Sequence, residues 1–223
     1  MNLNQIYKNI KQACQAAGRV TDGVTLLAVS KNQLPEAILP ILEAGHRLFG
    51  ENRVQEAARK WPILRAQYPD SRLHLIGSLQ TNKVRQALQL FDVIESIDRS
   101  NLVLTLAKEW GKPGQRTHKI LIQVNTGHEL QKSGVLIDDL PALIDLCRTM
   151  ALPLTGLMCI PPADEDPTPH FQQLAILAKT HQLPDLSMGM STDYPIAIAK
   201  GATWVRIGAA LWDSPNETAT AEV

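Results

Sequence analysis

Short apolar segments alternate with amphipathic helical patterns along most of this chain. About eight of them are strand candidates that are mainly apolar: 24–30, 48–50, 73–76, 93–97, 120–124, 154–160, 185–188 and 204–207. Strands that are apolar throughout are covered on both faces, as in parallel sheets with crossover helices. We therefore predict an α/β fold with a single (β/α)8 TIM barrel. A doubly wound sheet is the alternative that periodicity leaves open.

The ends of the chain differ from this pattern. Apolar residues recur at helical spacing over 3–17, which predicts an extra N-terminal helix before the first strand. The last stretch, 213–223, is polar and contains several alanines and threonines. We expect 1–212 to form one domain and 213–223 to be a disordered tail.

Composition excludes several classes of protein. Lys and Arg together number 22, as do Asp and Glu, so no global field favours nucleic acid or a membrane surface. The three cysteines and six histidines show no metal-ligand spacing, and we expect no metal. The N-terminus lacks the apolar core of a signal peptide, and no apolar run reaches the length of a membrane span. We expect a cytoplasmic protein.

Lys31 stands at the end of the first predicted strand, directly after an apolar run. A lysine at the mouth of a barrel is a candidate Schiff-base nucleophile once its neutral form is populated. The alternative is a solvated lysine that merely follows a buried strand.

Two segments near the C-terminus are suited to binding an anion. The strand 185–188 runs into Gly189 and then Ser191 and Thr192, and the strand 204–207 carries Arg206 and ends at Gly208. In barrels of this type, phosphate commonly binds at the loops after strands seven and eight, on N–H groups at helix N-termini. For 191–193 taken alone, an ordinary helix cap is the competing interpretation. A lysine after strand one and a phosphate site after strands seven and eight face one pocket. This arrangement predicts pyridoxal 5′-phosphate, held as an aldimine.

A set of motifs extends this hypothesis over nearly the whole chain. In order they are AVSK (28–31), GENRVQE (50–56), HLIG (74–77), LQTNK (79–83), QVN (123–125), KSG (132–134), GLM (156–158), SMGMS (187–191) and RIG (206–208). Together they resemble the pyridoxal phosphate homeostasis proteins. This resemblance implies a barrel of the alanine-racemase type, pyridoxal 5′-phosphate as cofactor, and a role in vitamin B6 and amino-acid balance without established catalysis.

The resemblance also implies roles for individual residues. The expected cofactor-binding set is Lys31 as the aldimine lysine, Asn52 near the ring, Arg206 at the pyridine nitrogen, and Ser191, Thr192, Gly208 and Ala209 at the phosphate. The chain departs from the family at Ser78, where many relatives have histidine, and at 209–212. These departures put side-chain contributions from Ser78 and Ala209 in doubt.

Arg206 has a chemical consequence in this role. A guanidinium can only donate, so a pyridine nitrogen that accepts from it stays unprotonated and the ring is a poorer electron sink. We therefore expect a protein that holds and releases its cofactor, with no catalytic residues.

Three other function classes stay open. They are an amino-acid racemase, a Schiff-base aldolase acting on a phosphosugar, and a regulatory protein whose cofactor reports vitamin B6 status. Cofactor-requiring apo-enzymes or a regulatory protein are the expected partners, and a monomer is the expected state.

Several charged residues near strand ends have two interpretations each. Lys83 and Lys132 either touch the pocket rim, accepting cofactor transiently, or are solvated loop lysines. Glu51 and Glu95 either orient Lys31 or Arg53, or are ordinary rim carboxylates.

Overall fold

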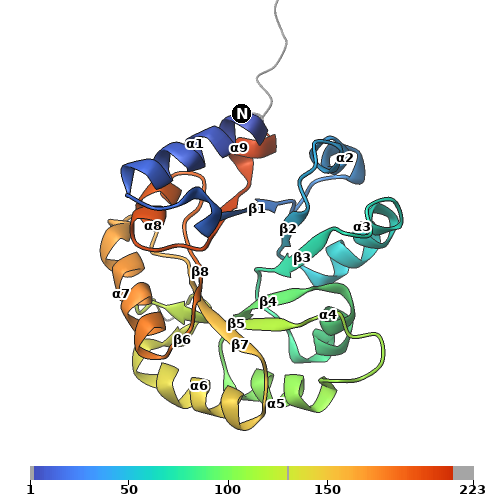
Figure 1. Ribbon diagram of the computed structural model, residues 1–223. Helices are drawn as coiled ribbons and strands as arrows, with labels where there is room; N and C mark the ends of the chain where they lie inside the picture. Colours follow the sequence, from blue (N-terminus) through green and yellow to red (C-terminus); the bar gives the residue numbers. More distant parts are fainter. Residues whose placement is uncertain (1–2, 130, 213–223) are drawn as a thin grey trace, which may run out of the picture.

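The computed structural model describes residues 3–129 and 131–212, and its centre is a parallel β-barrel (Figure 1). Nine strands form one sheet, and eight of them make a closed ring in the order β1-β2-β3-β4-β5-β7-β8-β9. Their bounds are Thr25–Val29 (β1), Leu48–Glu51 (β2), Arg72–Leu75 (β3), Val93–Ile97 (β4), Lys119–Asn125 (β5), Leu154–Cys159 (β7), Asp185–Ser187 (β8) and Trp204–Ile207 (β9). The predicted barrel is confirmed.

Two pairings close the ring. β1 pairs with β9 in parallel, with Leu27 opposite Arg206, and β4 pairs with β5, with Val93 opposite Lys119. An open doubly wound sheet would leave two free edges at these places, so that alternative is wrong. The ninth strand, β6 (Val135–Leu136), pairs with the end of β5 outside the ring. The sequence prediction missed it because two residues are too short to show periodicity.

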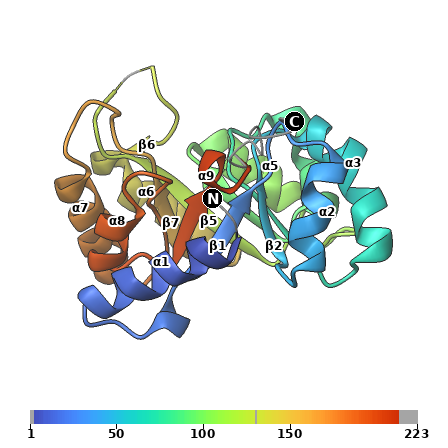
Figure 2. The same ribbon diagram turned by 90° about the horizontal axis from the view of Figure 1, so that it is seen from above.

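Helices cover the outside of the barrel, as Figures 1 and 2 show from two directions. Their bounds are Leu3–Ala16 (α1), Pro35–Glu43 (α2), Val54–Gln67 (α3), Val84–Leu90 (α4), Ser100–Glu109 (α5), Leu140–Thr149 (α6), Pro167–Thr180 (α7), Tyr194–Ala199 (α8) and Ala209–Trp212 (α9), with short 3-10 turns at Thr21–Gly23, Thr81–Lys83 and Ile137–Asp139. The predicted N-terminal helix is α1. It buries Leu3, Ile6, Ile10 and Cys14 on one face and packs against α8.

The core of the described residues consists of one large cluster and two small ones. The large cluster lies between the strands and the helices and includes Phe49, Trp61 and Phe171, each fully buried. Small apolar clusters, one around Leu27 and Ile76 and the other around Leu121 and Met158, form separate parts of the core. None of the helices in the described residues combines the length and apolar character needed to cross a membrane. The predicted tail, 213–223, lies outside the described residues.

Candidate functional site

A cavity of about 570 Å³ opens where the strands end at their carboxyl side. Parallel barrels direct the residues that follow their strands to this face. Six of the seven predicted cofactor residues line the cavity: Lys31, Asn52, Ser191, Arg206, Gly208 and Ala209. The other lining residues are Val29, Ile76, Gly77, Ser78, Gln123, Lys132, Ser133, Ile160 and Met190. The topology thus brings residues from both ends of the chain to one place.

Lys31 sits in a tight turn directly after β1, with its side chain exposed at the cavity. The next residue, Asn32, has a φ of 61° and donates its backbone N–H to Glu56 Oε1 at 2.6 Å. Lys60 Nζ donates to the carbonyl oxygens of Ser30 at 2.7 Å and Gln33 at 3.2 Å. The turn that carries Lys31 is therefore held from behind by two charged side chains of α3.

A buried carboxylate supports this turn further. Glu51 is fully buried, and its Oε1 accepts from Ser30 Oγ at 2.5 Å and from Trp61 Nε1 at 3.1 Å. The same oxygen lies 2.9 Å from Lys60 Nζ. Burial raises the pKa of Glu51, although the hydrogen bonds from Ser30, Lys60 and Trp61 oppose the shift. We call Ser30, Glu51, Lys60 and Trp61 the Glu51 cluster.

Arg206 lies on β9, the strand that pairs with β1, where it lines the cavity and is 3% exposed. Its Nη1 donates to Ser187 Oγ at 2.8 Å and its Nη2 to the carbonyl oxygen of Cys159 at 2.7 Å. A guanidinium has five N–H groups, so others are left for a ligand.

Ser187 connects Arg206 to a second buried carboxylate. Ser187 Oγ donates to Glu95 Oε2 at 2.5 Å, and Glu95 Oε1 lies 2.6 Å from His74 Nδ1. β4 and β8 are not neighbours in the ring, so this link crosses the barrel interior. His74 is 2% exposed and has this carboxylate as its partner, so it is a satisfied core residue. We call His74, Glu95, Ser187 and Arg206 the Glu95 cluster.

The structure excludes the rim interpretation of Glu51 and Glu95, and Glu51 supports the Lys31 turn only indirectly, through Ser30 and Lys60. Both side chains are 0% exposed, so they are not rim carboxylates. Their hydrogen bonds go to Ser30 and Ser187 and not to Lys31 or Arg53. Sequence analysis assigned no role to Lys60 and named Ser187 only within the motif SMGMS, because a local pattern does not reveal which distant side chain a polar residue contacts.

The loops after β8 and β9 form the wall of the cavity next to Arg206. Gly189 has a φ of +89°, and a Cβ there would lie 2.5 Å from Ala197, so this turn requires glycine. Asp193 Oδ1 accepts from Met190 N at 2.5 Å, which closes the loop around Ser191. Its side chain makes no cap hydrogen bond to α8, so the ordinary helix-cap interpretation does not describe it.

The last helix completes this wall. α9 starts at Ala209, and the first N–H groups of a helix have no partner within it. Trp212 Nε1 donates to the carbonyl oxygen of Val29 at 2.6 Å, which ties α9 to the end of β1. Gly208 and Ala209 thereby lie beside the strand that leads to Lys31.

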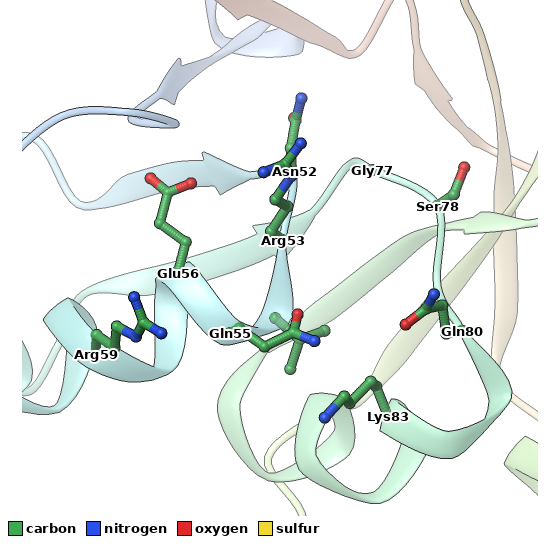
Figure 3. Close-up of a pocket in the computed structure, with 10 residues that line it drawn as sticks. Asn52, Arg53, Gln55, Glu56, Arg59, Gly77, Ser78, Gln80 and Lys83 are labelled. Carbon is green, nitrogen blue, oxygen red and sulfur yellow. The ribbon is translucent and has the colours of Figure 1, made fainter.

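The remaining candidate residues lie in different places. Thr192 is exposed and lies outside the cavity lining. Lys132 lines the cavity and pairs with Glu129 at 2.7 Å. Ser78 lines the cavity and shares a hydrogen bond of 2.7 Å with Ser133 across it. Lys83 lines a neighbouring cleft instead (Figure 3).

The donor set fits a small phosphorylated aldehyde with an aromatic ring. It offers two amines (Lys31 and Lys132), one buried guanidinium, three serine hydroxyls and backbone N–H groups around one cavity. The three cysteines are buried, and burial raises the pKa of the Cys147 and Cys159 thiols to about 12, so none is an activated nucleophile. No cluster of potential metal ligands occurs among residues 3–129 and 131–212.

Several known proteins are similar to this chain in sequence and in fold. The family model described as "Alanine racemase, N-terminal domain" matches residues 1–215. The pyridoxal phosphate homeostasis protein of Aquifex aeolicus is 40% identical over 222 residues, covering 94% of this chain and 95% of its own. That of Vibrio alginolyticus is 41% identical over 223 residues, covering 95% of each chain.

A solved structure agrees with these matches. The structure of PipY from Synechococcus elongatus with pyridoxal phosphate bound has a TM-score of 0.76 and 36% identity, and covers 91% of this chain and 99% of that one. Alanine racemase from Bacillus anthracis, at 20% identity and a TM-score of 0.63, shares the fold over 97% of this chain and 57% of its own. The chain therefore belongs to the pyridoxal phosphate homeostasis protein family.

Proposed function

We propose that this protein holds pyridoxal 5′-phosphate reversibly and so maintains the supply of this cofactor and amino-acid balance, without catalysis of its own. The observation that carries the proposal is the convergence of Lys31 and Arg206 on one cavity. We assign residues 1–212 to a single cofactor-binding domain, and we propose a cytoplasmic monomer. Apo-enzymes that need the cofactor, or a regulatory protein, are its proposed partners.

Each residue of the cavity has a proposed task. When bound, the cofactor supplies an aldehyde that the Lys31 amine takes up as a reversible Schiff base. Ser191 and the N–H groups of Gly208 and Ala209 bind the phosphate, and Arg206 donates to the pyridine nitrogen. Asn52 contacts the ring. Thr192 is also proposed as a phosphate ligand, and its hydroxyl has to turn inward to reach the cavity.

Two features favour storage over turnover. Arg206 cannot deliver a proton to the ring nitrogen at physiological pH, so the electron sink that racemisation needs is weak. In the described part of the chain, the cavity lining includes no tyrosine, histidine, cysteine or carboxylate. The second amine there, Lys132, pairs with Glu129. Racemisation with two bases needs an acid–base group on each face of the cofactor.

The absorption spectrum of loaded protein tests the proposal. We expect wild type to be yellow and Lys31→Ala to lose the band, because the mutant lacks the amine. Lys132→Ala, the matched control in the same cavity, should keep it. An unchanged spectrum in Lys31→Ala, or a lost band in Lys132→Ala, would move the attachment to another lysine. A colourless wild type would favour the aldolase alternative.

Deuterium exchange tests the absence of catalysis. Cofactor-loaded protein incubated with amino acids in D₂O should leave the Cα hydrogen in place. Exchange that depends on Lys31 would establish the racemase alternative.

A further inference from the structure

A second cleft, of about 810 Å³, adjoins the cofactor cavity (Figure 3). Three cationic side chains line it: Arg53 and Arg59 at the N-terminal end of α3, and Lys83 in the turn Thr81–Lys83. Its size lies within the range of small-molecule sites. The proposed function uses none of these three side chains.

The cations of this basic cleft have no close partner among the described residues, although the charge of Arg53 helps to lower the pKa of Glu56. Among the ion pairs and side-chain hydrogen bonds of the described residues, none involves Arg53, Arg59 or Lys83. One carboxylate, Glu56, lines the cleft, but its Oε1 already accepts from Lys60 Nζ at 2.8 Å and from Asn32 N at 2.6 Å. Like charges gathered around one cleft repel each other, and a bound anion relieves that repulsion.

The other groups in the basic cleft are also suited to an anion. Gln55 and Gln80 offer amide N–H donors from its two sides, as Figure 3 shows. α3 has 14 residues and begins at the cleft, so its unpaired N–H groups and the positive end of its dipole lie there. Arg53, at its N-cap, makes no capping hydrogen bond with its side chain. Val54 is the apolar residue of the lining, and it is buried.

The chemistry of this lining selects its ligand. Arginine forks bind carboxylates and phosphates through paired hydrogen bonds, and three cations exceed what one singly charged anion can neutralise. We infer that the basic cleft is a second binding site, for a small polyanion that carries at least two carboxylate or phosphate groups.

The site lies next to the cofactor cavity. Asn52, Gly77 and Ser78 line both spaces. A Cβ on Gly77 would lie 2.2 Å from the carbonyl oxygen of Asn52, so the wall between them is packed backbone against backbone. A polyanion held by Arg53, Arg59 and Lys83 would therefore lie next to the cofactor without using Lys31 or Arg206.

Calorimetric titration at constant ionic strength tests this inference. Pyrophosphate and citrate are the probes, because they separate phosphate from carboxylate recognition, and acetate is the singly charged comparison. Wild type loaded with pyridoxal phosphate should bind at least one probe saturably at one site, and acetate far more weakly.

Two double variants locate the binding. Arg53→Gln with Lys83→Gln should weaken probe binding by at least about tenfold, because each charge-assisted contact contributes at least that much. Lys8→Gln with Arg72→Gln removes the same charge from exposed positions outside the cleft and should change affinity less than about twofold.

Three results would overturn the inference. One is that neither probe binds saturably to wild type. Another is that both double variants lose affinity for the probe to the same extent. The third is binding that disappears on loading with pyridoxal phosphate, because the probe then occupies the cofactor cavity. If the protein takes up no pyridoxal phosphate, the proposed function fails, while titration of the unloaded variants still tests the basic cleft.

Discussion

The Glu51 cluster and the Glu95 cluster each place a fully buried carboxylate behind a residue of the cofactor cavity. In the Glu51 cluster the carboxylate pairs directly with Lys60, and Lys60 holds the backbone of the turn that carries Lys31. In the Glu95 cluster the carboxylate reaches Arg206 through the hydroxyl of Ser187.

The difference separates two ways of supporting a site. None of the Glu51 cluster lines the cavity, so that cluster acts on the position of the Lys31 backbone. Arg206 does line it, so the Glu95 cluster acts on a group that meets the cofactor. Disruption of the Glu51 cluster should therefore mainly lower the stability of the fold. Disruption of the Glu95 cluster should mainly change the absorption spectrum of the cofactor.

Lys60→Met should give the largest effect. Lys60 is 6% exposed, and its removal leaves the buried Glu51 without a cation, at a cost of about 3 kcal/mol in the free energy of unfolding at neutral pH. Because Glu51 already has a raised pKa, it can take up a proton in the folded state, so the loss should shrink as the pH falls.

Urea unfolding at two pH values measures this effect. The control is Lys108→Met at an exposed position of α5, which should change stability by less than about 0.5 kcal/mol. Equal stability of Lys60→Met and wild type at neutral pH would show that the buried ion pair does not support the turn.

Glu95→Gln should affect the cofactor more than the fold. Glutamine keeps the shape and can still bond to Ser187, but it removes the negative charge behind Arg206. We expect a shifted absorption band and an affinity for the cofactor that is weakened by about tenfold, or about 1.4 kcal/mol. Arg206→Ala should show the same spectral change more strongly.

Glu51→Gln is the matched control for this prediction. It makes the same substitution at an equally buried site and should leave the band in place. Identical spectra for the two glutamine variants would contradict a separate role for the Glu95 cluster.

Glu56→Gln should give the smallest effect, and one that depends on pH. Burial opposes ionisation of Glu56, but the hydrogen bonds from Lys60 and the Asn32 N–H outweigh it and hold its pKa below the ordinary 4.5. A carboxyl whose pKa is lower in the folded state stabilises the fold fully at pH values above its pKa in the unfolded state. This contribution is lost as the pH falls through its pKa in the folded state.

The free energy of unfolding of wild type and Glu56→Gln, measured against pH, checks the direction of this effect. The variant should be less stable at neutral pH by under about 1 kcal/mol, and the difference should vanish in acid. A difference that grows as the pH falls below 4.5 would contradict the assignment.

The barrel could be predicted from the sequence because every buried strand leaves a local apolar run. Most of the predicted cavity residues could be predicted because they lie at or shortly after the carboxyl end of a strand, and a barrel brings these ends to one face. The two clusters could not be predicted, since Glu95 and Ser187 are 92 positions apart and their pairing depends on the barrel having closed. Ser191 and Thr192 are adjacent hydroxyls, and only the conformation of the loop decides that Ser191 lines the cavity.

Peptide mapping after borohydride reduction tests directly whether Lys31 holds the cofactor. Reduction fixes the cofactor to the amine that holds it, and digestion with mass spectrometry then identifies the lysine. We predict that wild type carries the label on Lys31, and that Glu51→Gln and Glu95→Gln carry it there as well. A label mainly on Lys132 or on any other lysine, or no label at all, would contradict this prediction.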